Sequence, residues 1–169
     1  LLKQDDWDFV QLQLNYVGWE VQDARRLYEM LEQRGIPCIV MEPVRGGSLH
    51  TLCPEAISLL KQARPKRSVA SWAIRYAASL PNVLTVLSGM NSLEQVRDNV
   101  TAMTGFTPLD QEERAVLDKA RAAYLQTGAI PCTGCGYCMH CPMGVDIPKV
   151  FALYNARAAT LGLPVSTSG

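Results

Sequence analysis

The chain has 169 residues, of which 48% are hydrophobic and 19% charged, and its 16 lysines and arginines balance 16 acidic residues. This composition predicts a soluble, globular protein with one domain and a smaller appendage. Zero net charge gives no electrostatic basis for binding nucleic acid or an anionic membrane, and the apolar runs are too short to span a bilayer. The chain starts at Leu1 and enters a strand pattern within a few residues, so we expect it to be a piece of a longer protein.

The first half of the chain alternates strand and helix patterns. Residues 9–17 alternate apolar and polar side chains, which predicts a strand whose polar face meets solvent or lines a ligand cavity. Residues 22–34 have helical apolar spacing, and Gly35 supplies the C-terminal cap. The apolar run at 38–44 is typical of a buried strand, and an Arg-Gly-Gly turn at 45–47 closes it.

The same rhythm continues along the second half. Helices are predicted at 54–64, 68–80, 92–103 and 109–125 and after Pro148, with a buried strand at 83–87. Ser92 with Gln95, and Asp110 with Glu113, have the spacing of helix capping boxes. Alternation of this kind predicts an α/β fold with parallel strands. Three strands are too few to close a barrel, so a barrel parent would place this chain in its second half.

Four of the six cysteines form a dense run near the C-terminus. They are Cys132, Cys135, Cys138 and Cys141, at a constant spacing of three, and a proline follows the last. Thiolates at this spacing can turn toward one centre while backbone N–H groups point at the sulfurs. Nearby Gly134, Gly136 and Gly144 permit the tight turns that this requires. The run therefore predicts a [4Fe-4S] cluster, because it is close to the bacterial ferredoxin ligand pattern.

Other interpretations of the cysteines remain open. Zinc held by four cysteines is an alternative, although zinc sites usually have a longer spacer between ligand pairs. Disulfides are the least favoured, because neighbouring bridges would be strained. The last spacer is one residue shorter than in the ferredoxin pattern, which leaves the fourth ligand open. Cys38 and Cys53 are the remaining candidates, and each is more simply interpreted as a buried thiol. Reduced, clustered cysteines indicate a cytoplasmic protein.

Three stretches together resemble the C-terminal half of the aldo/keto reductases. They are V-Q-L-Q-L-N at 10–15, M-E-P-V-R-G-G at 41–47 and L-S-G-M-N-S-L-E-Q-V-R-D-N at 87–99. With the cysteine run, which continues as C-P-M-G-V-D-I-P, they are similar to the branch whose barrel precedes a ferredoxin-like motif. This resemblance implies the C-terminal part of a (β/α)8 TIM barrel at 1–127. A short ferredoxin-like cysteine-rich segment and a C-terminal helix are implied at 128–169.

The resemblance also implies a cofactor, NADP(H), bound at the mouth of the barrel. The implied contacts are Gln11 and Met41 at the nicotinamide, Pro43, Arg45 and Gly46 at the pyrophosphate, and Gly89, Ser92, Gln95 and Asn99 at the adenosine end. The helix after Ser92 would present free N–H groups to a phosphate, although a simple cap also explains Ser92 and Gln95. Gly89 stands where the family places a lysine for the 2′-phosphate, so charge there would come from Arg45 or Arg97.

The implied activity is the reduction of small carbonyl compounds by hydride transfer. The family's catalytic Asp, Tyr, Lys and His belong to the first half of the barrel, so the resemblance implies no catalytic residue in this chain. His50 and His140 lie outside the family's catalytic context. The intact protein is therefore expected to be an NAD(P)-dependent oxidoreductase, and this portion alone is expected to be inactive.

A different class of function remains as an alternative. The chain would then be a ferredoxin-like electron-transfer or redox-sensing module on an α/β scaffold. Gly136, Tyr137 and His140 would form a docking surface for a redox partner protein, although solvated turn residues explain them equally well. Half a barrel also exposes strand edges and apolar faces, so self-association is expected for the isolated chain.

Overall fold

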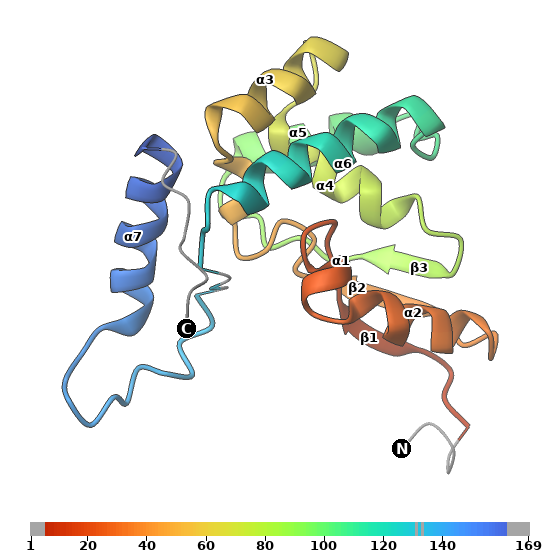
Figure 1. The fold of residues 1–169 in the computed structure, drawn as a ribbon. Helices are drawn as coiled ribbons and strands as arrows, with labels where there is room; N and C mark the ends of the chain where they lie inside the picture. The colour runs from red at the N-terminus through yellow and green to blue at the C-terminus, as the bar shows by residue number, and fades with distance from the viewer. Residues whose placement is uncertain (1–5, 131, 133, 162–169) are drawn as a thin grey trace.

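A small parallel sheet forms the framework of the protein. The computed structural model describes residues 6–130, 132 and 134–161. Its strands are β1 (Val10–Gln13), β2 (Cys38–Met41) and β3 (Val83–Val86), hydrogen-bonded in that order. The described helices are α1 (Gly18–Val21), α2 (Ala24–Glu32), the 3-10 helix η1 (Ser48–His50), α3 (Pro54–Ala63), α4 (Val69–Ala78), α5 (Leu93–Met103), α6 (Gln111–Gln126) and α7 (Ile147–Leu161). The predicted α/β alternation with parallel strands is confirmed (Figure 1).

The central strand β2 sets the register of the sheet. Its residue Val40 pairs with Leu12 of β1 on one side and with Val86 of β3 on the other. Cys38 and Val40 are fully buried, while Ile39 and Met41 are half-buried. The strand ends at Met41, and the next residue, Glu42, has a φ of 57° in the left-handed region, which turns the chain out of the sheet. The strand predicted at 38–44 is therefore shorter than expected.

Helix α4 joins two hydrophobic cores. Trp72 and Ala73 pack in a core formed mainly with α3 and α6, where Leu60 and Leu117 are almost fully buried. One turn further along, Ala77 belongs to a second core between the sheet and α2. Burial of a large aromatic side chain on one face and small residues on the other lets α4 lie close to both neighbours. This helix therefore connects the helical layer to the sheet.

The first strand is shorter than its alternating pattern predicts. Leu14, Asn15, Tyr16 and Val17 follow β1 and are all buried. Asn15 was expected on a polar strand face, but its Oδ1 accepts a hydrogen bond from Gly18 N at 2.6 Å, and its Nδ2 donates to Glu42 O at 3.3 Å. These bonds satisfy a buried amide and begin α1, which the sequence pattern did not indicate.

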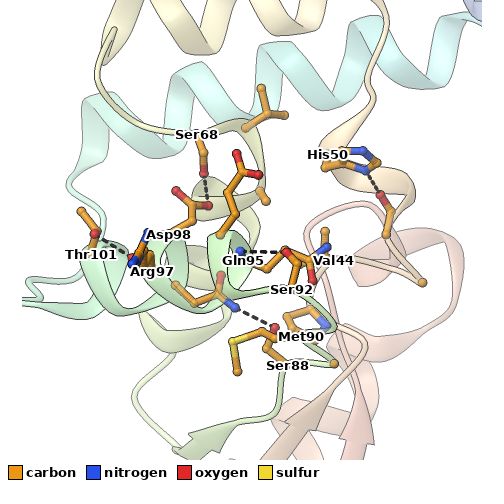
Figure 2. A pocket seen from close by; sticks show the side chains of 18 of the residues that line it. Val44, His50, Ser68, Ser88, Met90, Ser92, Gln95, Arg97, Asp98 and Thr101 are labelled. Atoms are coloured by element: carbon orange, nitrogen blue, oxygen red, sulfur yellow. Dashed lines mark hydrogen bonds between the residues drawn. The ribbon is translucent and has the colours of Figure 1, made fainter.

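The third strand is not buried as predicted. Leu84 is 64% exposed, and Leu93 and Val100 on the following helix α5 are 64% and 59% exposed. Within the described chain, β3 pairs with β2 alone and forms one edge of the sheet. Exposed apolar side chains therefore lie on both β3 and α5. The loops that follow β2 and β3 lie across from each other at one end of the sheet (Figure 2).

Several predicted helix ends are confirmed in detail. Gly35 has a φ of 65°, and Ile36 N donates to Leu31 O, as expected for a glycine C-terminal cap. Pro54 is the first residue of α3. Asp110 and Glu113 form the reciprocal capping box of α6. Local sequence signals were sufficient here because each cap depends on neighbouring residues alone.

The C-terminal helix α7 stands apart from the sheet and the other helices (Figure 1). A long segment without helices or strands in its described residues joins it to α6. Ala158 is buried, whereas Leu153 on α7 is 65% exposed. Across the residues that the structure describes, every helix is too short or too polar to cross a membrane.

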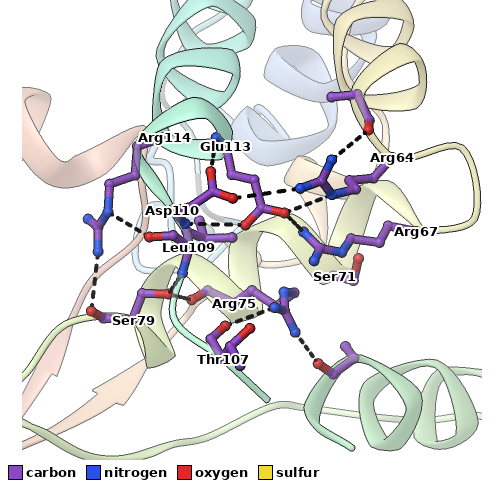
Figure 3. Close-up of polar contacts among 12 residues, drawn as sticks. Arg64, Arg67, Ser71, Arg75, Ser79, Thr107, Leu109, Asp110, Glu113 and Arg114 are labelled. Carbon is purple, nitrogen blue, oxygen red and sulfur yellow. Dashed lines mark hydrogen bonds and ion pairs between the residues drawn. The ribbon is translucent and has the colours of Figure 1, made fainter. Parts of the chain in front are cut away.

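A buried carboxylate fastens three helices together (Figure 3). Glu113 of α6 is 5% exposed, and its Oε1 accepts hydrogen bonds from Arg64 Nε at 2.9 Å and from Arg67 Nη1 at 2.7 Å. Arg64 ends α3, and Arg67 precedes α4. The second oxygen of Glu113 accepts from Asp110 N at 3.3 Å. One side chain therefore caps α6 and pairs with two cations of different segments.

Replacing Glu113 should destabilise the fold strongly. Glu113→Ala leaves the Asp110 N–H and the partly buried Arg67 without their partner, and we expect a loss of about 2 kcal/mol in the free energy of unfolding. Glu112→Ala is the matched control, because this neighbour is an exposed acid in the same helical turn. It should cost about 0.5 kcal/mol or less. Urea denaturation of both variants measures the difference, and equal midpoints would contradict the role of Glu113.

Candidate functional site

A pocket of about 1050 Å³ opens beyond the C-terminal ends of β2 and β3 (Figure 2). One wall is the loop after β2, which includes Pro43 and Gly46. The opposite wall is the loop after β3 and the first turns of α5. Ligands of α/β proteins usually bind at this end of parallel strands, because the loops there converge. The pocket is therefore the principal candidate site in the described chain.

Three predicted cofactor residues shape the α5 wall. Ser92 Oγ accepts a hydrogen bond from Gln95 N at 3.3 Å and caps α5. In the expected capping box, Gln95 would accept a hydrogen bond from the backbone N–H of Ser92. Its Oε1 accepts instead from the preceding residue, Asn91 N, at 2.9 Å. Asn99 Nδ2 donates to Ser88 Oγ at 2.9 Å and ties the helix to the preceding loop. These bonds hold the N-terminus of α5, with its positive dipole end, at the pocket.

Gly89 leaves open space in the same wall. A Cβ built at this position would have no heavy atom within 4 Å, and its φ lies outside the left-handed region. The glycine is therefore required neither by packing nor by backbone conformation in this structure. Gly89 leaves room in this wall for another molecule to approach the backbone.

The far end of the pocket contains polar residues that the sequence reasoning did not single out. Ser68 Oγ donates to Asp98 Oδ2 at 2.5 Å, which links the start of α4 to α5. Lys61 and Thr101 also line this region, and Arg97 is exposed beside it. Arg97 had been considered only as a source of charge. The only signal for the others is three-dimensional, since they come from three separate helices.

The loop wall is conformationally demanding. Arg45, Gly46 and Gly47 have φ values of 52°, 60° and 88°, so three consecutive residues occupy the left-handed region. Glycine accepts this conformation readily, whereas arginine does so at a cost. The ring of His50 is hydrogen-bonded through Nδ1 to Gly47 O and lines the pocket. The Arg-Gly-Gly turn predicted from the sequence thus forms the base of this wall.

Two predicted nicotinamide contacts lie outside the pocket lining. Gln11 on β1 donates from Nε2 to Met41 Sδ at 3.0 Å, so the two residues lie side by side on the sheet. Pro43, Gly46, Gly89, Ser92, Gln95 and Asn99 do line the pocket. The structure thus brings together the residues assigned to the pyrophosphate and adenosine ends, except Arg45. Gln11 and Met41 form a separate pair.

The side chain of Arg45 points into the protein interior. Arg45 is 2% exposed, and its Nε and Nη2 have no hydrogen-bond partner among the described residues. Burial raises the pKa of the Tyr16 phenol, Tyr124 and Cys53 raise it further, and the charge of nearby Arg45 opposes the shift. Buried guanidinium nitrogens without hydrogen-bond partners are costly. Arg45 is therefore next to the pocket loop in sequence but separate from the pocket surface.

Comparisons with known proteins agree with this arrangement. The sequence profile of the Aldo/keto reductase family matches residues 1–122. The chain belongs to the aldo/keto reductase family. Comparison with curated protein sequences gave no significant match.

Solved aldo/keto reductases have a similar fold. The holo form of AKR11C1 from Bacillus halodurans superposes with a TM-score of 0.54 and is 25% identical, over 70% of this chain and 44% of that one. The apo form has the same TM-score and identity. The thermostable Tm1743, solved with the inhibitor epalrestat, has a TM-score of 0.50 at 22% identity, over 65% of this chain and 38% of that one. The chain therefore spans less than half the length of these reductases.

The cysteine segment lies beyond the family match and contains tight glycine turns and an N–H···S hydrogen bond. Gly134 N donates to Cys132 Sγ at 3.4 Å, and Gly134, Gly136 and Gly144 have φ values of 70°, 76° and 69°. Such N–H···S contacts and glycine turns are typical of loops that wrap iron–sulfur clusters. The donor set of this aldo/keto reductase chain therefore fits a cluster in its chemistry and backbone.

The sulfurs themselves are not gathered around one point. Among the described residues, no three His, Cys, Asp or Glu side chains are arranged to hold a metal ion. Cys135 is exposed, and Cys132, Cys138 and Cys141 are half-buried. All six cysteines lie in the described part of the chain, and none forms a disulfide. Metal binding at these thiols requires the loop to close further.

The two remaining cysteines, Cys38 and Cys53, lie in other elements of the fold. Cys38 lies in the centre of the sheet, and burial raises the pKa of its thiol to about 11. Cys53 is buried where α3 begins. A metal ligand must be a thiolate, and the raised pKa of Cys38 disfavours that form. The four clustered cysteines are therefore the better ligand candidates in this aldo/keto reductase chain.

Proposed function

We propose that the chain forms the dinucleotide-binding part of an NADP(H)-dependent oxidoreductase that reduces small carbonyl compounds. The pocket supports this proposal most directly. It joins the loop after β2 to the Ser88–Asn99 stretch, which the family resemblance assigns to the pyrophosphate and the adenosine end. The nicotinamide, when bound, supplies a hydride to the carbonyl carbon. The residues of this chain bind and orient the cofactor, and we propose no proton donor among them.

The pocket offers different chemistry to each part of a dinucleotide. The free N–H groups at the start of α5, next to Ser92, suit a phosphate. The amide side chains of Gln95 and Asn99 suit the hydrogen-bonding edge of a base or the hydroxyls of a ribose. Lys61 and Arg97 bring positive charge to this pocket, and Glu42, Glu94 and Asp98 in the same lining offset it. The N–H groups and the amides therefore support a dinucleotide, and the choice of NADP(H) rests on the family resemblance.

A substitution at Gly89 should change cofactor binding without changing the stability of the fold. Gly89→Ala should leave the free energy of unfolding unchanged, because the new methyl group meets open space. The same methyl group should obstruct a bound nucleotide and weaken NADPH binding roughly tenfold, equivalent to about 1.4 kcal/mol. Fluorescence titration with NADPH and urea denaturation measure the two effects. Lys119→Ala, an exposed change on α6, serves as the control. Equal NADPH affinity for wild type and Gly89→Ala would argue against the proposed site.

We further propose a two-part organisation, with the half-barrel at 1–127 and a [4Fe-4S] segment at 128–169. The glycine turns and the N–H donor to Cys132 Sγ support the second part. A cluster transfers one electron at a time, whereas hydride transfer moves two electrons together. The cluster therefore need not exchange electrons with the nicotinamide, and we propose for it either a structural role or electron exchange with a redox partner. The exposed side chains of Tyr137 and Met143 favour a docking surface as the second candidate function.

Anoxic reconstitution tests the cluster directly. The chain, incubated with ferrous iron and sulfide, should take up about four irons and four sulfides per chain and acquire a broad visible absorbance. Replacing Cys135 and Cys138 together by serine should abolish both. Zinc bound in place of iron, with no sulfide, would support the alternative site of four cysteines around one ion. A chain that retains neither metal would contradict both assignments.

We also propose that the isolated chain self-associates through the apolar face formed by β3 and α5. The exposed side chains of Leu84, Leu93 and Val100 support this. Leu93→Glu should keep the chain monomeric at concentrations where wild type forms dimers. Sedimentation velocity across a concentration series measures the difference, and a monomeric wild-type chain at every concentration would contradict the proposal.

A further inference from the structure

The side chain of Asn155 connects helix α7 to the beginning of the cysteine segment. Asn155 Oδ1 accepts a hydrogen bond from Ile130 N at 2.7 Å, and Asn155 Nδ2 donates to Ile130 O at 2.9 Å. The amide thus satisfies both polar groups of one backbone residue that is 25 positions away in the sequence. Such a two-point contact fixes orientation as well as distance.

The same backbone carbonyl positions the first cysteine. Ile130 O also accepts a hydrogen bond from Cys132 N at 2.7 Å. The sulfur of Cys132 in turn accepts from Gly134 N at 3.4 Å. Hydrogen bonds therefore run from Asn155 through Ile130 to the backbone N–H of Cys132, the residue whose sulfur accepts from Gly134. Loss of the Asn155 contact would release the residue that anchors this thiol.

The other end of the cysteine segment is fixed to the same helix. Asp146 caps α7, because its Oδ1 accepts from Lys149 N at 3.2 Å and its backbone oxygen accepts from Val150 N at 3.0 Å. Gly144 N donates to Cys141 O at 2.9 Å and connects the last cysteine to this cap. Helix α7 therefore holds one end of the segment at its N-terminus and the other end at Asn155.

We propose that Asn155 is a positioning residue, which holds the Cys132 end of the cysteine segment against α7 so that the four thiols can enclose an inorganic cluster. This inference rests on the proposed [4Fe-4S] segment. Closing a loop of this length costs chain entropy, and a contact formed before the metal binds removes part of that cost. Asn155 itself is not expected to contact the cluster.

Two substitutions separate the hydrogen bonds of Asn155. Asn155→Ala removes both, whereas Asn155→Asp keeps an acceptor for Ile130 N but has no donor for Ile130 O. Leu153→Ala is the control, because this side chain is exposed on the same helix. Each full-length chain is reconstituted anoxically with ferrous iron and sulfide and then mixed with a ferrous chelator. We expect Asn155→Ala to lose its visible absorbance roughly tenfold faster than wild type, Asn155→Asp to be intermediate, and Leu153→Ala to match wild type.

A second measurement does not require the cluster. Hydrogen exchange of the Ile130 amide in the metal-free chain should be at least about fivefold faster in Asn155→Ala and close to wild type in Asn155→Asp. Far-UV circular dichroism of each variant establishes that α6 and α7 remain folded.

The outcomes distinguish the inference from the proposed function. If the wild-type chain takes up no iron and sulfide, the proposed cluster fails and the role of Asn155 fails with it. If wild type is loaded but Asn155→Ala releases its cluster at the wild-type rate, the role of Asn155 alone is overturned. Equal acceleration in Leu153→Ala would also overturn it, because the effect would then belong to α7 in general.

Discussion

The guanidinium of Arg75 fixes the direction of α5, and through α5 the shape of the pocket. Arg75 is buried on α4, and its two terminal nitrogens donate to Ala102 O at 2.7 Å and to Thr107 O at 2.9 Å (Figure 3). Burial lowers the pKa of Arg75, yet an arginine remains charged at neutral pH. A cation at the C-terminal end of α5 satisfies carbonyls that the helix leaves free and complements its dipole. The opposite end, at Ser92, consequently faces the pocket.

The two candidate sites depend on different kinds of order. The pocket is built by loops that the parallel sheet and α4 hold in place, so its walls are supported by buried side chains. The cysteine segment has glycine turns, two helix contacts and exposed side chains. Rigid elements hold side chains in place through packing, whereas a loop of turns depends on its backbone hydrogen bonds and on the contacts at its ends. The pocket residues are therefore held by the packed cores, and the cysteine segment by its hydrogen bonds with α7.

The sequence predicted the features that depend on neighbouring residues. The capping box of Asp110 with Glu113, the cap at Gly35 and the strand–helix alternation were all readable, because period and cap chemistry are local. The predicted length of β1 was wrong. The alternating pattern continues through Asn15, but the buried amide of this residue binds Glu42 O, and the strand ends before it. The predicted burial of β3 was also wrong, because the residue pattern within a strand does not indicate whether another strand pairs beside it.

The candidate site was predictable in part for the same reason. Residues of the Ser88–Asn99 stretch are consecutive and carry a recognisable motif, so their grouping in the pocket agrees with the expectation from sequence. Lys61 and Ser68 join the pocket from α3 and from the start of α4, and only the packing of those helices brings them there. The inward direction of Arg45 likewise follows from the left-handed turn at 45–47 and from the interior around Tyr16 and Tyr124.

The contact between Asn155 and Ile130 has a consequence for the topology of the chain. It brings the entry of the cysteine excursion back to its own exit helix, outside the 1–122 region that matches the family. The chain between these two residues therefore forms a loop closed by its own hydrogen bonds. These bonds hold its ends together without involving the sheet, so the loop is tied to itself and joined to the family fold through α6.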